Sequence, residues 1–397
     1  MTHLRARHIR FIGPVPIDDG CVVIDNGKVV DVGPTSRIKP PRIDVDIDGL
    51  LIPGLINFHT HLELTNVARP ARVETFQQWI LDVASARQNS APHDAAAGVV
   101  AGVMAGVAQC IRFGVTEVWD ITQNPSVVRP VLAKSPIRSI SFGECLGIGS
   151  RQNRFDTLLS AALDRTHENP RMRVGISPHA PYTVDERGYA LALSSAQQYG
   201  MPLMTHLAET PDESRFLLDH GGPFGALYDA IGSDPGAAPG FVDGPVKWLA
   251  AINRAKVPLI AAHCNYCDDD ELALLADMNA TIVWCPRTHA YFGHALPHPV
   301  MRMKNDKRLI VRIGTDSCAS SPDLNIVDDL RLAHQYGMPA EALFRNAVRA
   351  CEIGAMADLV AFDIDAIQRA SCPLEAVLNQ HVLPSGVWID GTRHVTL

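Results

Sequence analysis

Titratable side chains stand where apolar segments of this 397-residue chain end. His59 and His61 follow the apolar residues 50–58, and on a β-strand residues i and i+2 point to the same face. Both imidazoles can therefore bind one metal ion. The pair alone also fits two ordinary histidines on a half-exposed strand, so its interpretation depends on the rest of the chain.

Four later apolar segments also end in residues that can bind a metal. These residues are His179, His206, His263 and Asp316. If the segments are parallel strands of one barrel, their carboxyl ends meet at one mouth of that barrel. A packed barrel does not need such a set of imidazoles for its stability, so the pattern indicates a metal site.

The residue types indicate the chemistry of that site. Neutral imidazole and carboxylate suit one divalent transition metal ion, zinc or iron(II). Three histidines and one aspartate leave a position on the ion for a water molecule. The pKa of that water would fall to roughly 7. Glu209, three residues after His206, could carry a proton between this water and a substrate nitrogen. His263 could hydrogen-bond the nucleophile, and Asp316 could contact the metal and accept the proton of the water. The alternative for Glu209 is a solvated acid at the start of a helix.

The apolar segments alternate with helical patterns, notably in residues 95–113 and 269–278. This alternation predicts right-handed βαβ units and an α/β fold whose eight strands close into a (β/α)8 TIM barrel. Two long connections, residues 64–99 and 210–256, would open on the catalytic face as substrate walls or a lid. The expected strands are centred on Ile56 and on residues 116–121, 140–145, 174–177, 203–206, 259–263, 282–285 and 310–315.

Both ends of the chain predict short strands outside the barrel. Asn26-Gly27 separates two β-branched runs, which is a strong hairpin signal. Residues 358–363 and 386–391 have a similar strand pattern. We therefore predict that residues 1–50 and 351–397 pair into one small β-sandwich, and that residues 51–350 form the barrel.

Composition argues against several classes of partner. The formal charge is −8, from 35 Lys and Arg against 43 Asp and Glu, so the chain is expected to bind no nucleic acid and no anionic membrane. No segment is expected to approach 18 apolar residues, and the first residues lack the apolar core of a signal peptide. The nine scattered cysteines, an odd number, suit a reducing compartment, so we expect a cytoplasmic protein. The negative net charge favours a neutral or cationic small molecule as substrate.

The sequences around these residues resemble the amidohydrolase superfamily, in the branch that holds cytosine, guanine and S-adenosylhomocysteine deaminases and triazine chlorohydrolases. The likeness extends from residue 53 to about residue 330, and its motifs are highly specific when taken together. They are residues 53–62 (PGLINFHTHL), 177–182 (SPHAPY), 206–209 (HLAE), 262–264 (AHC) and 314–317 (GTDS).

The resemblance implies one metal ion. Relatives with two metals usually carry a carboxylated lysine at the fourth strand, whereas residues 173–179 of this chain contain no lysine. One divalent ion is therefore expected, with zinc favoured over iron. Relatives are often dimers or larger, which leaves a homo-oligomer open. The implied metal ligands are His59, His61, His206 and Asp316.

The resemblance also implies roles for residues that do not bind the metal. Glu209 would be the proton shuttle, and His263 would orient the water. His179 is similar to the family's substrate-contacting histidine, and Glu144, at the end of the third strand, would contact the substrate or a neighbouring loop. Residues 285–294 (CPRTHAYFGH) depart from the family pattern, so Arg287 is a further candidate for a substrate contact.

We expect hydrolytic deamination of an amino-substituted heteroaromatic ring, such as a purine or nucleoside, by a metal-bound hydroxide. Residues 76–80 (FQQWI) resemble aminofutalosine deaminases, although Phe76 and Trp79 fit ordinary helix packing equally well. One alternative is hydrolysis of a halide or a cyclic amide, and another is a catalytically silent binding module. Glu209 favours deamination, because chloride leaves without a proton.

Overall fold

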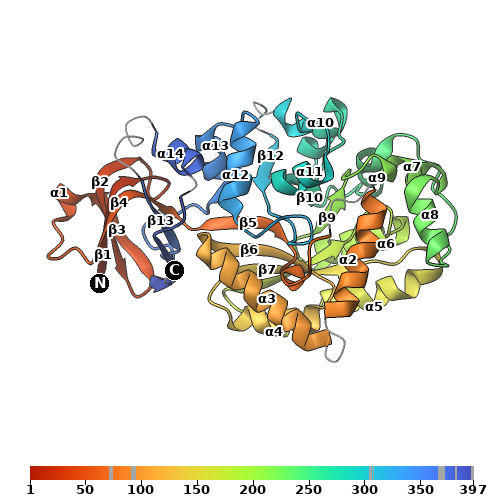
Figure 1. The fold of residues 1–397 in the computed structure, drawn as a ribbon, viewed down its shortest axis with the longest axis horizontal. Coiled ribbons are helices and arrows are strands. Elements are labelled where there is room, and N and C mark those ends of the chain that lie inside the picture. The colour runs from red at the N-terminus through yellow and green to blue at the C-terminus, as the bar shows by residue number, and fades with distance from the viewer. Residues whose placement is uncertain are drawn as a thin grey trace.

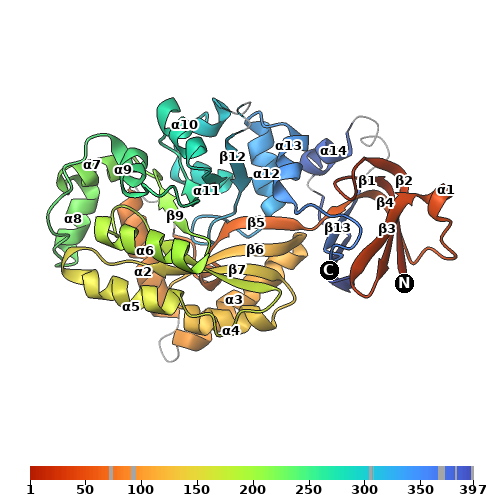
Figure 2. The same cartoon turned by 180° about the vertical axis from the view of Figure 1, so that it is seen from behind.

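The computed structural model of the chain has two lobes of unequal size (Figure 1). It describes residues 1–70, 75–90, 95–303, 306, 308–364, 372–380 and 382–394. The smaller lobe contains both ends of the chain, and the larger lobe contains the segments between them. The view from behind shows the same division (Figure 2).

The strands divide between the two lobes. Those of the smaller lobe are β1 (Thr2–Ile9), β2 (Ile17–Asp25), β3 (Lys28–Pro34), β4 (Val45–Pro53), β13 (Leu359–Asp363), β14 (Gly386–Ile389) and β15 (Thr392–His394). Those of the larger lobe are β5 (Leu55–Thr60), β6 (Val115–Thr122), β7 (Arg138–Cys145), β8 (Met172–Pro178), β9 (Met204–Leu207), β10 (Ile260–His263), β11 (Thr281–Trp284) and β12 (Ile310–Ile313).

Helices connect these strands. The α-helices are α1 (Thr35–Ile38), α2 (Phe76–Ser90), α3 (Ala95–Arg112), α4 (Pro125–Lys134), α5 (Gln152–Ala162), α6 (Glu186–Tyr199), α7 (Asp212–Asp219), α8 (Gly222–Ala230), α9 (Gly244–Ile252), α10 (Asp269–Asp277), α11 (Pro286–Phe292), α12 (Ile326–Gln335), α13 (Ala340–Ala347) and α14 (Pro373–Asn379). Short 3-10 helices are η1 (Leu62–Leu64), η2 (Gly149–Arg151) and η3 (Pro299–Met301).

The smaller lobe is built on one seven-stranded sheet of order β15-β14-β13-β4-β1-β2-β3. The two ends of the chain pair as predicted, because β4 runs parallel to β1 and antiparallel to β13. That direct pairing joins the described strands into a single sheet, where we had predicted a sandwich of two. β4 also continues past the predicted boundary at residue 50 to Pro53. The predicted hairpin turn is present, with Asn26 and Gly27 both at positive φ.

The larger lobe contains two four-stranded parallel sheets, β5-β6-β7-β8 and β12-β11-β10-β9. Every one of the eight predicted strand segments is found, and helices separate consecutive strands, so the α/β class is confirmed. The long connection after β5 contains α2 and α3, and the one after β9 contains α7, α8 and α9. This alternation places the ends of all eight strands at the same side of the lobe.

Two seams join these sheets into a ring. Thr60 forms a parallel bridge with Asp316, and Ile176 forms one with Leu203. Across the first seam, the backbone N–H of Asp316 donates to the carbonyl oxygen of His59 at 3.0 Å. Each seam is an isolated bridge in the described residues, and the strands on the β9 to β12 side are four residues long. A continuous ladder around the predicted barrel is therefore not present.

Helix α3 is long and apolar enough to cross a membrane by length and composition alone. The sequence-based expectation that no segment reaches this length was therefore wrong. Packing accounts for the composition of one face of the helix. A Cβ atom at Gly102 would lie 2.7 Å from the carbonyl oxygen of Glu63, so glycine permits a close approach to η1. Val103, Val107 and Cys110 are buried in the core of the larger lobe.

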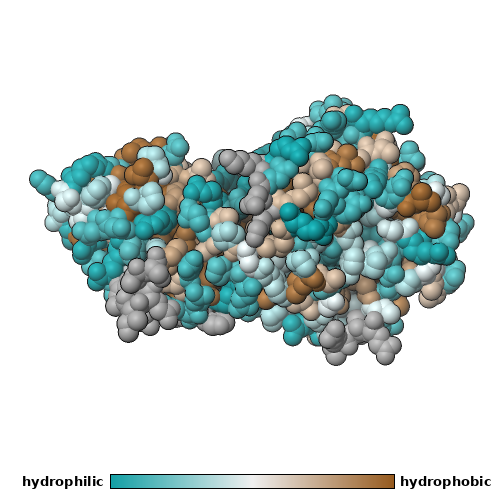
Figure 3. Space-filling model, turned by 90° about the horizontal axis from the view of Figure 1, so that it is seen from above, coloured by the Kyte–Doolittle hydropathy of each residue, from teal (hydrophilic) through white to brown (hydrophobic). Residues whose placement is uncertain are grey.

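Apolar side chains fill the space enclosed by the two parallel sheets. They include Ile56, Phe58, Ile121, Ile140, Phe142, Met204, Ile260 and Val283. Seen from above, the outer surface is mostly hydrophilic, with hydrophobic side chains in separate patches (Figure 3). This close-packed apolar core holds the strands in place, and it thereby fixes the positions of the side chains at the ends of the strands.

Candidate active site

Four imidazoles gather where β5, β9 and β10 end. His59 is the next-to-last residue of β5 and His61 follows that strand, while His206 lies in β9 and His263 ends β10. The centroid of the His59 ring lies 5.1 Å from that of His61, 5.0 Å from that of His206 and 5.3 Å from that of His263. The structure thus brings together histidines that are separated by up to about half of the chain.

Asp316 joins this group from the segment after β12. Its Oδ1 lies 3.6 Å from Nε2 of both His59 and His61. The backbone N–H of Ser317 and the hydroxyl of Ser320 donate to its two oxygens at 2.7 and 3.1 Å. Burial by itself would raise the pKa of Asp316, but the neighbouring His59 and the other imidazoles hold that pKa well below its usual range. Asp316 is therefore a carboxylate.

The donor set fits a divalent transition metal. Nε2 of His59 and Nε2 of His263 are buried and have no hydrogen-bond partner in the described residues, as expected of atoms that face an ion or a bound molecule. Burial lowers the pKa of His206 to about 3 and that of His61 well below its usual value, so both rings are neutral. Nδ1 of His206 lies 3.0 Å from the carbonyl oxygen of His179, and its Nε2 lies 3.4 Å from Nε2 of His61, so these two nitrogens can bind one metal ion.

Glu209 lies beside the histidines in the loop after β9. Its Oε1 is 3.6 Å from Nε2 of His263, and its side chain is 5% exposed. Burial raises the pKa of Glu209 well above its usual value, and the negative charges of Asp316 and Glu213 raise it further. Burial thus favours the protonated form of Glu209, the form that can donate a proton as a general acid.

Glu213 is a residue of the site that the sequence analysis missed. It is fully buried, and its carboxylate accepts hydrogen bonds from three consecutive backbone N–H groups, those of Ala208 at 3.0 Å, Glu209 at 2.6 Å and Thr210 at 3.3 Å. These bonds hold the loop that carries Glu209. The spacing Thr-x-x-Glu at residues 210–213 matches a capping box and was the available signal.

The carbonyl side of the same loop is held by Asn265, which the sequence analysis also missed. Nδ2 of Asn265 donates to the carbonyl oxygen of Glu209 at 3.1 Å, and its Oδ1 lies 3.1 Å from Nδ1 of His289. His298 in turn holds the carbonyl oxygen of His263 at 3.0 Å. The predicted acid and its partner histidine are thus fixed through their backbones by residues distant in sequence.

Exchange of Glu213 for glutamine is expected to lower kcat about tenfold and to leave the metal content unchanged. A glutamine offers only one acceptor oxygen and presents an NH2 group to a backbone N–H, so at least one hydrogen bond is lost and Glu209 shifts. The steady-state rate against pH checks this, because a shift of the Glu209 environment also moves the pH profile. Glu186→Gln, an exposed acid at the start of α6, is the matched control. An unchanged rate and profile would show that Glu213 does not position Glu209.

Glu144 and His179, both predicted to contact the substrate, lie together on the other side of His206. Nε2 of Gln123 donates to Oε2 of Glu144 at 2.6 Å, and Oε1 of Glu144 is 3.9 Å from Nε2 of His179. Burial lowers the pKa of His179 to about 4, so its ring is neutral, and its Nδ1 lies 2.7 Å from the hydroxyl of Thr183. The ligand atoms of Glu144, His179 and His206 lie within 4.8 Å of one another.

Aromatic side chains form a cluster that extends from His179. Tyr182 lies 5.5 Å from the His179 ring and stacks on Phe224 at 3.9 Å, measured between centroids. Phe76 and Trp79, in the long connection after β5, each lie 5.1 Å from Phe292 of α11. This cluster joins α2, α8 and α11. The packing role that we weighed for Phe76 and Trp79 is thus seen within α2, where their ring centroids are 5.6 Å apart, and also between helices.

Arg287 is engaged elsewhere. Its Nε donates to Asp329 at 2.8 Å, its Nη1 donates to the side chain of Asp323 at 2.6 Å, and its Nη2 donates to the carbonyl oxygen of Asp323 at 2.8 Å. These bonds tie α11 to the start of α12. This geometry speaks against the predicted contact with substrate, because the guanidinium group is held by its two acidic neighbours.

Exchange of Arg287 for alanine is expected to lower the free energy of unfolding by about 3 kcal/mol, because it leaves the fully buried Asp329 without its partner charge. KM should not change. Chemical denaturation checks the first expectation and steady-state kinetics the second. Arg302→Ala removes a 40% exposed arginine that pairs with Asp269, and should cost less than about 1 kcal/mol. A raised KM in folded Arg287→Ala protein would restore the substrate role.

The chain is similar in sequence to a known protein family and to curated proteins. The family described as "Amidohydrolase family" matches residues 50–393. Aminodeoxyfutalosine deaminase of Deinococcus radiodurans is 28% identical over 353 residues, which cover 83% of this chain and 80% of that protein.

Two solved structures share the fold. An adenosine deaminase from Xanthomonas campestris with bound zinc superposes with a TM-score of 0.80 at 23% identity, covering 99% of this chain and 92% of that one. The atrazine chlorohydrolase TrzN from Arthrobacter aurescens, complexed with zinc, superposes with a TM-score of 0.79 at 19% identity, covering 100% and 95%. The family match includes the histidine and aspartate positions described above as well as most of the chain. The chain therefore belongs to the amidohydrolase family.

Proposed function

We propose that this protein is a metal-dependent aminohydrolase that removes an exocyclic amine from the heteroaromatic ring of a nucleoside-like small molecule. The observation that carries the proposal is Glu209, a buried acid with a raised pKa 3.6 Å from His263, beside a donor set that fits a metal. A departing amine needs a proton, whereas a departing chloride does not. The similarity to a deaminase of aminodeoxyfutalosine supports the same reaction class.

One divalent transition metal ion would be held by His59, His61, His206 and Asp316. Zinc is the first candidate, since it suits imidazole and carboxylate ligands and is bound in two proteins of the same fold. Iron is the second candidate, because the same ligands accept it. When bound, such an ion acts as a Lewis acid and lowers the pKa of a water molecule.

The side chains around the ion divide the proton transfers between them. Asp316, a carboxylate, accepts a proton from the attacking water, whose oxygen bonds to the ring carbon that bears the amine. Glu209 donates its proton to the adjacent ring nitrogen, and His263 hydrogen-bonds the oxygen on which charge develops. The carbon–nitrogen bond then breaks as the proton held by Asp316 passes to the amine, which leaves as ammonia, and the second proton of the water restores Glu209. Water and substrate thus give ammonia and an oxo-substituted ring.

The surroundings of Glu144 favour a substrate without a negative charge near the ring. Burial raises the pKa of Glu144 and lowers that of His179, so this pair offers hydrogen bonds to hydroxyl or amino groups and no positive charge to an anion. The aromatic faces of Phe76 and Tyr182 offer apolar surface for the rest of the molecule. We also propose that the two parallel sheets act as one (β/α)8 barrel around the site, which the bridges at both seams support.

Release of ammonia from a panel of adenosine-like nucleosides, purines, pterins and aminotriazines tests the proposal. The metal-loaded protein should release ammonia from at least one nucleoside-like compound in stoichiometric amounts with the oxo product. Parallel chloride measurement with chlorotriazines tests the chlorohydrolase alternative. Chloride release without any ammonia would replace deamination by dehalogenation. No turnover of any compound by protein with a full metal content would favour a binding module.

A further inference from the structure

A cavity lies at the opposite ends of the strands from the candidate active site. Its volume is about 320 Å³, within the usual range of small-ligand pockets. It is lined by the first residues of β5, β6 and β7, by the start of β8, and by the segments 349–351 and 355–358 that lead into the smaller lobe. The cavity therefore lies between the two lobes, and no step proposed for the reaction uses it.

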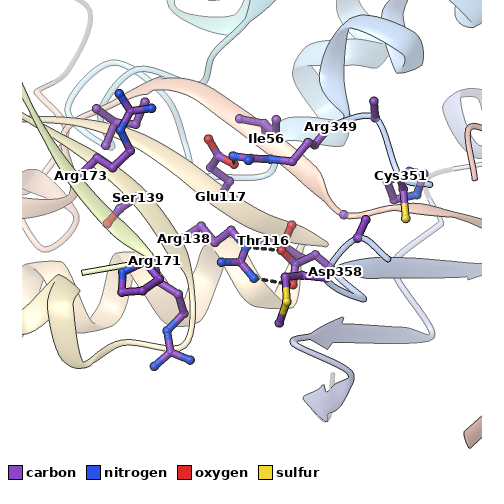
Figure 4. A pocket seen from close by; sticks show the side chains of 17 residues that line it. Ile56, Thr116, Glu117, Arg138, Ser139, Arg171, Arg173, Arg349, Cys351 and Asp358 are labelled. Carbon is purple, nitrogen blue, oxygen red and sulfur yellow. Dashed lines mark hydrogen bonds and ion pairs between the residues drawn. The ribbon is translucent and has the colours of Figure 1, made fainter. Parts of the chain in front are cut away.

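Arginines dominate the charges that line this cavity (Figure 4). Among the described residues, the cavity is lined by four arginines and by two carboxylates, Glu117 and Asp358. Asp390, which pairs with two of the arginines, reduces the excess to one positive charge. The arginines are Arg138, Arg171, Arg173 and Arg349. This local excess contrasts with the formal charge of −8 for the whole chain.

Two of the arginines join the lobes. Arg138 at the start of β7 pairs with Asp358 and Asp390, and Arg171 pairs with Asp390 at 3.0 Å. Arg138 uses its Nε and Nη2 in these pairs, so its Nη1 remains for another acceptor. These ion pairs hold the two lobes together, and in them two arginine charges are matched by two aspartate charges.

The other two arginines, Arg173 and Arg349, take no part in these ion pairs between the lobes. In the described part of the chain, Arg349 contacts Glu117 through Nη2, and its side chain is 64% exposed. Arg173 is exposed, and no hydrogen bond or ion pair engages its guanidinium group within the described residues. Its pairing register with Ile140 places both side chains on the same face of the sheet, toward the cavity. Figure 4 shows Arg173 and Arg349 on opposite sides of Glu117.

We propose that this cavity binds a small divalent oxyanion, a phosphate or a dicarboxylate, held by Arg173 and Arg349 above Arg138. Guanidinium groups bind such oxygens through paired N–H donors, and exposed arginines can turn inward at little desolvation cost. Arg349 keeps its bond to Glu117 while its remaining N–H groups bind the anion. Because Arg138 is tied to the smaller lobe, the bound anion links the two lobes and stabilises the folded protein.

Calorimetric titration of the metal-loaded protein with inorganic phosphate tests this proposal, with succinate as the dicarboxylate arm and chloride at matched ionic strength as the reference. We expect saturable binding of at least one of the two divalent anions, and a rise in Tm that chloride does not produce. Arg173→Ala should weaken that binding by at least about tenfold. Arg187→Ala, an exposed arginine on α6 that pairs with Asp156, should leave it unchanged.

The variants also separate this cavity from the metal site at the other end of the strands. Arg173→Ala should retain metal content and the rate of ammonia release, since Arg173 lies far from the histidines along β8. Arg349→Ala provides a second variant in case Arg173→Ala fails to fold. Equal responses to phosphate and chloride would overturn the proposal, and so would phosphate and succinate binding that both arginine variants retain.

Discussion

Exchange of Glu209 for glutamine is expected to lower kcat for ammonia release by about 10²-fold to 10⁴-fold, while the metal stays bound. Glutamine fills nearly the same volume but cannot donate an acid proton to a ring nitrogen. The residue makes no proposed bond to the ion, so the metal content should stay near that of the unchanged protein. The measurement is steady-state ammonia release at saturating substrate, together with metal analysis of the same sample.

A matched control is Glu341→Gln, which changes a 55% exposed acid on α13. It should leave kcat and metal content unaltered. If Glu209→Gln protein turned over at the normal rate, the proton shuttle would be assigned to the wrong residue. If the variant lost its metal as well, Glu209 would belong to the metal site, and its kcat would no longer report on proton transfer.

Removal of one predicted ligand should abolish both metal binding and turnover. His61 is the best choice, because its side chain is 14% exposed whereas that of His59 is fully buried. His61→Ala is expected to weaken metal binding by more than about 100-fold, since loss of a mere supporting partner already costs 10-fold to 100-fold. Metal per chain by mass spectrometry and the rate of ammonia release check this. Tm should fall as the stabilisation by the ion is lost.

His167→Ala, a partly exposed histidine before β8, is the matched control and should keep metal and activity. Chelator treatment of the unchanged protein should reproduce the loss, and added zinc should restore activity to the chelated protein but not to His61→Ala. Full activity in metal-free protein would contradict the metal-dependent mechanism as a whole. Normal metal content in His61→Ala would remove this histidine from the ligand set.

Local patterns were sufficient to predict the strands that hold the site. Apolar runs followed by His59, His206 and His263 are strands in the structure, because alternating βαβ connections force parallel strands to end on one side. The types of those residues then indicated a metal. The structure adds their mutual distances, such as 5.0 Å between the rings of His59 and His206.

Residues that act through long-range contacts were harder to predict. Arg287 stands in a loop near other polar residues, which suggested a substrate contact, and only the fold shows that Asp323 and Asp329 take up its guanidinium group. Asn265 holds the backbone of Glu209 from 56 residues away. Neither pairing leaves a periodic signal, because the partners lie on different elements whose packing is set by the whole core.

The sequence by itself determined the α/β alternation, the strand segments and the chemical identity of the groups at their ends, since these follow from hydrophobic periodicity and side-chain chemistry. The tertiary structure alone decided which of these groups meet. It seated Glu209 against His263 and joined both ends of the chain in one sheet. It also gathered arginines from β7, β8 and the segment after α13 around one cavity. Burial and distance set pKa values and binding, and both arise only when the core packs.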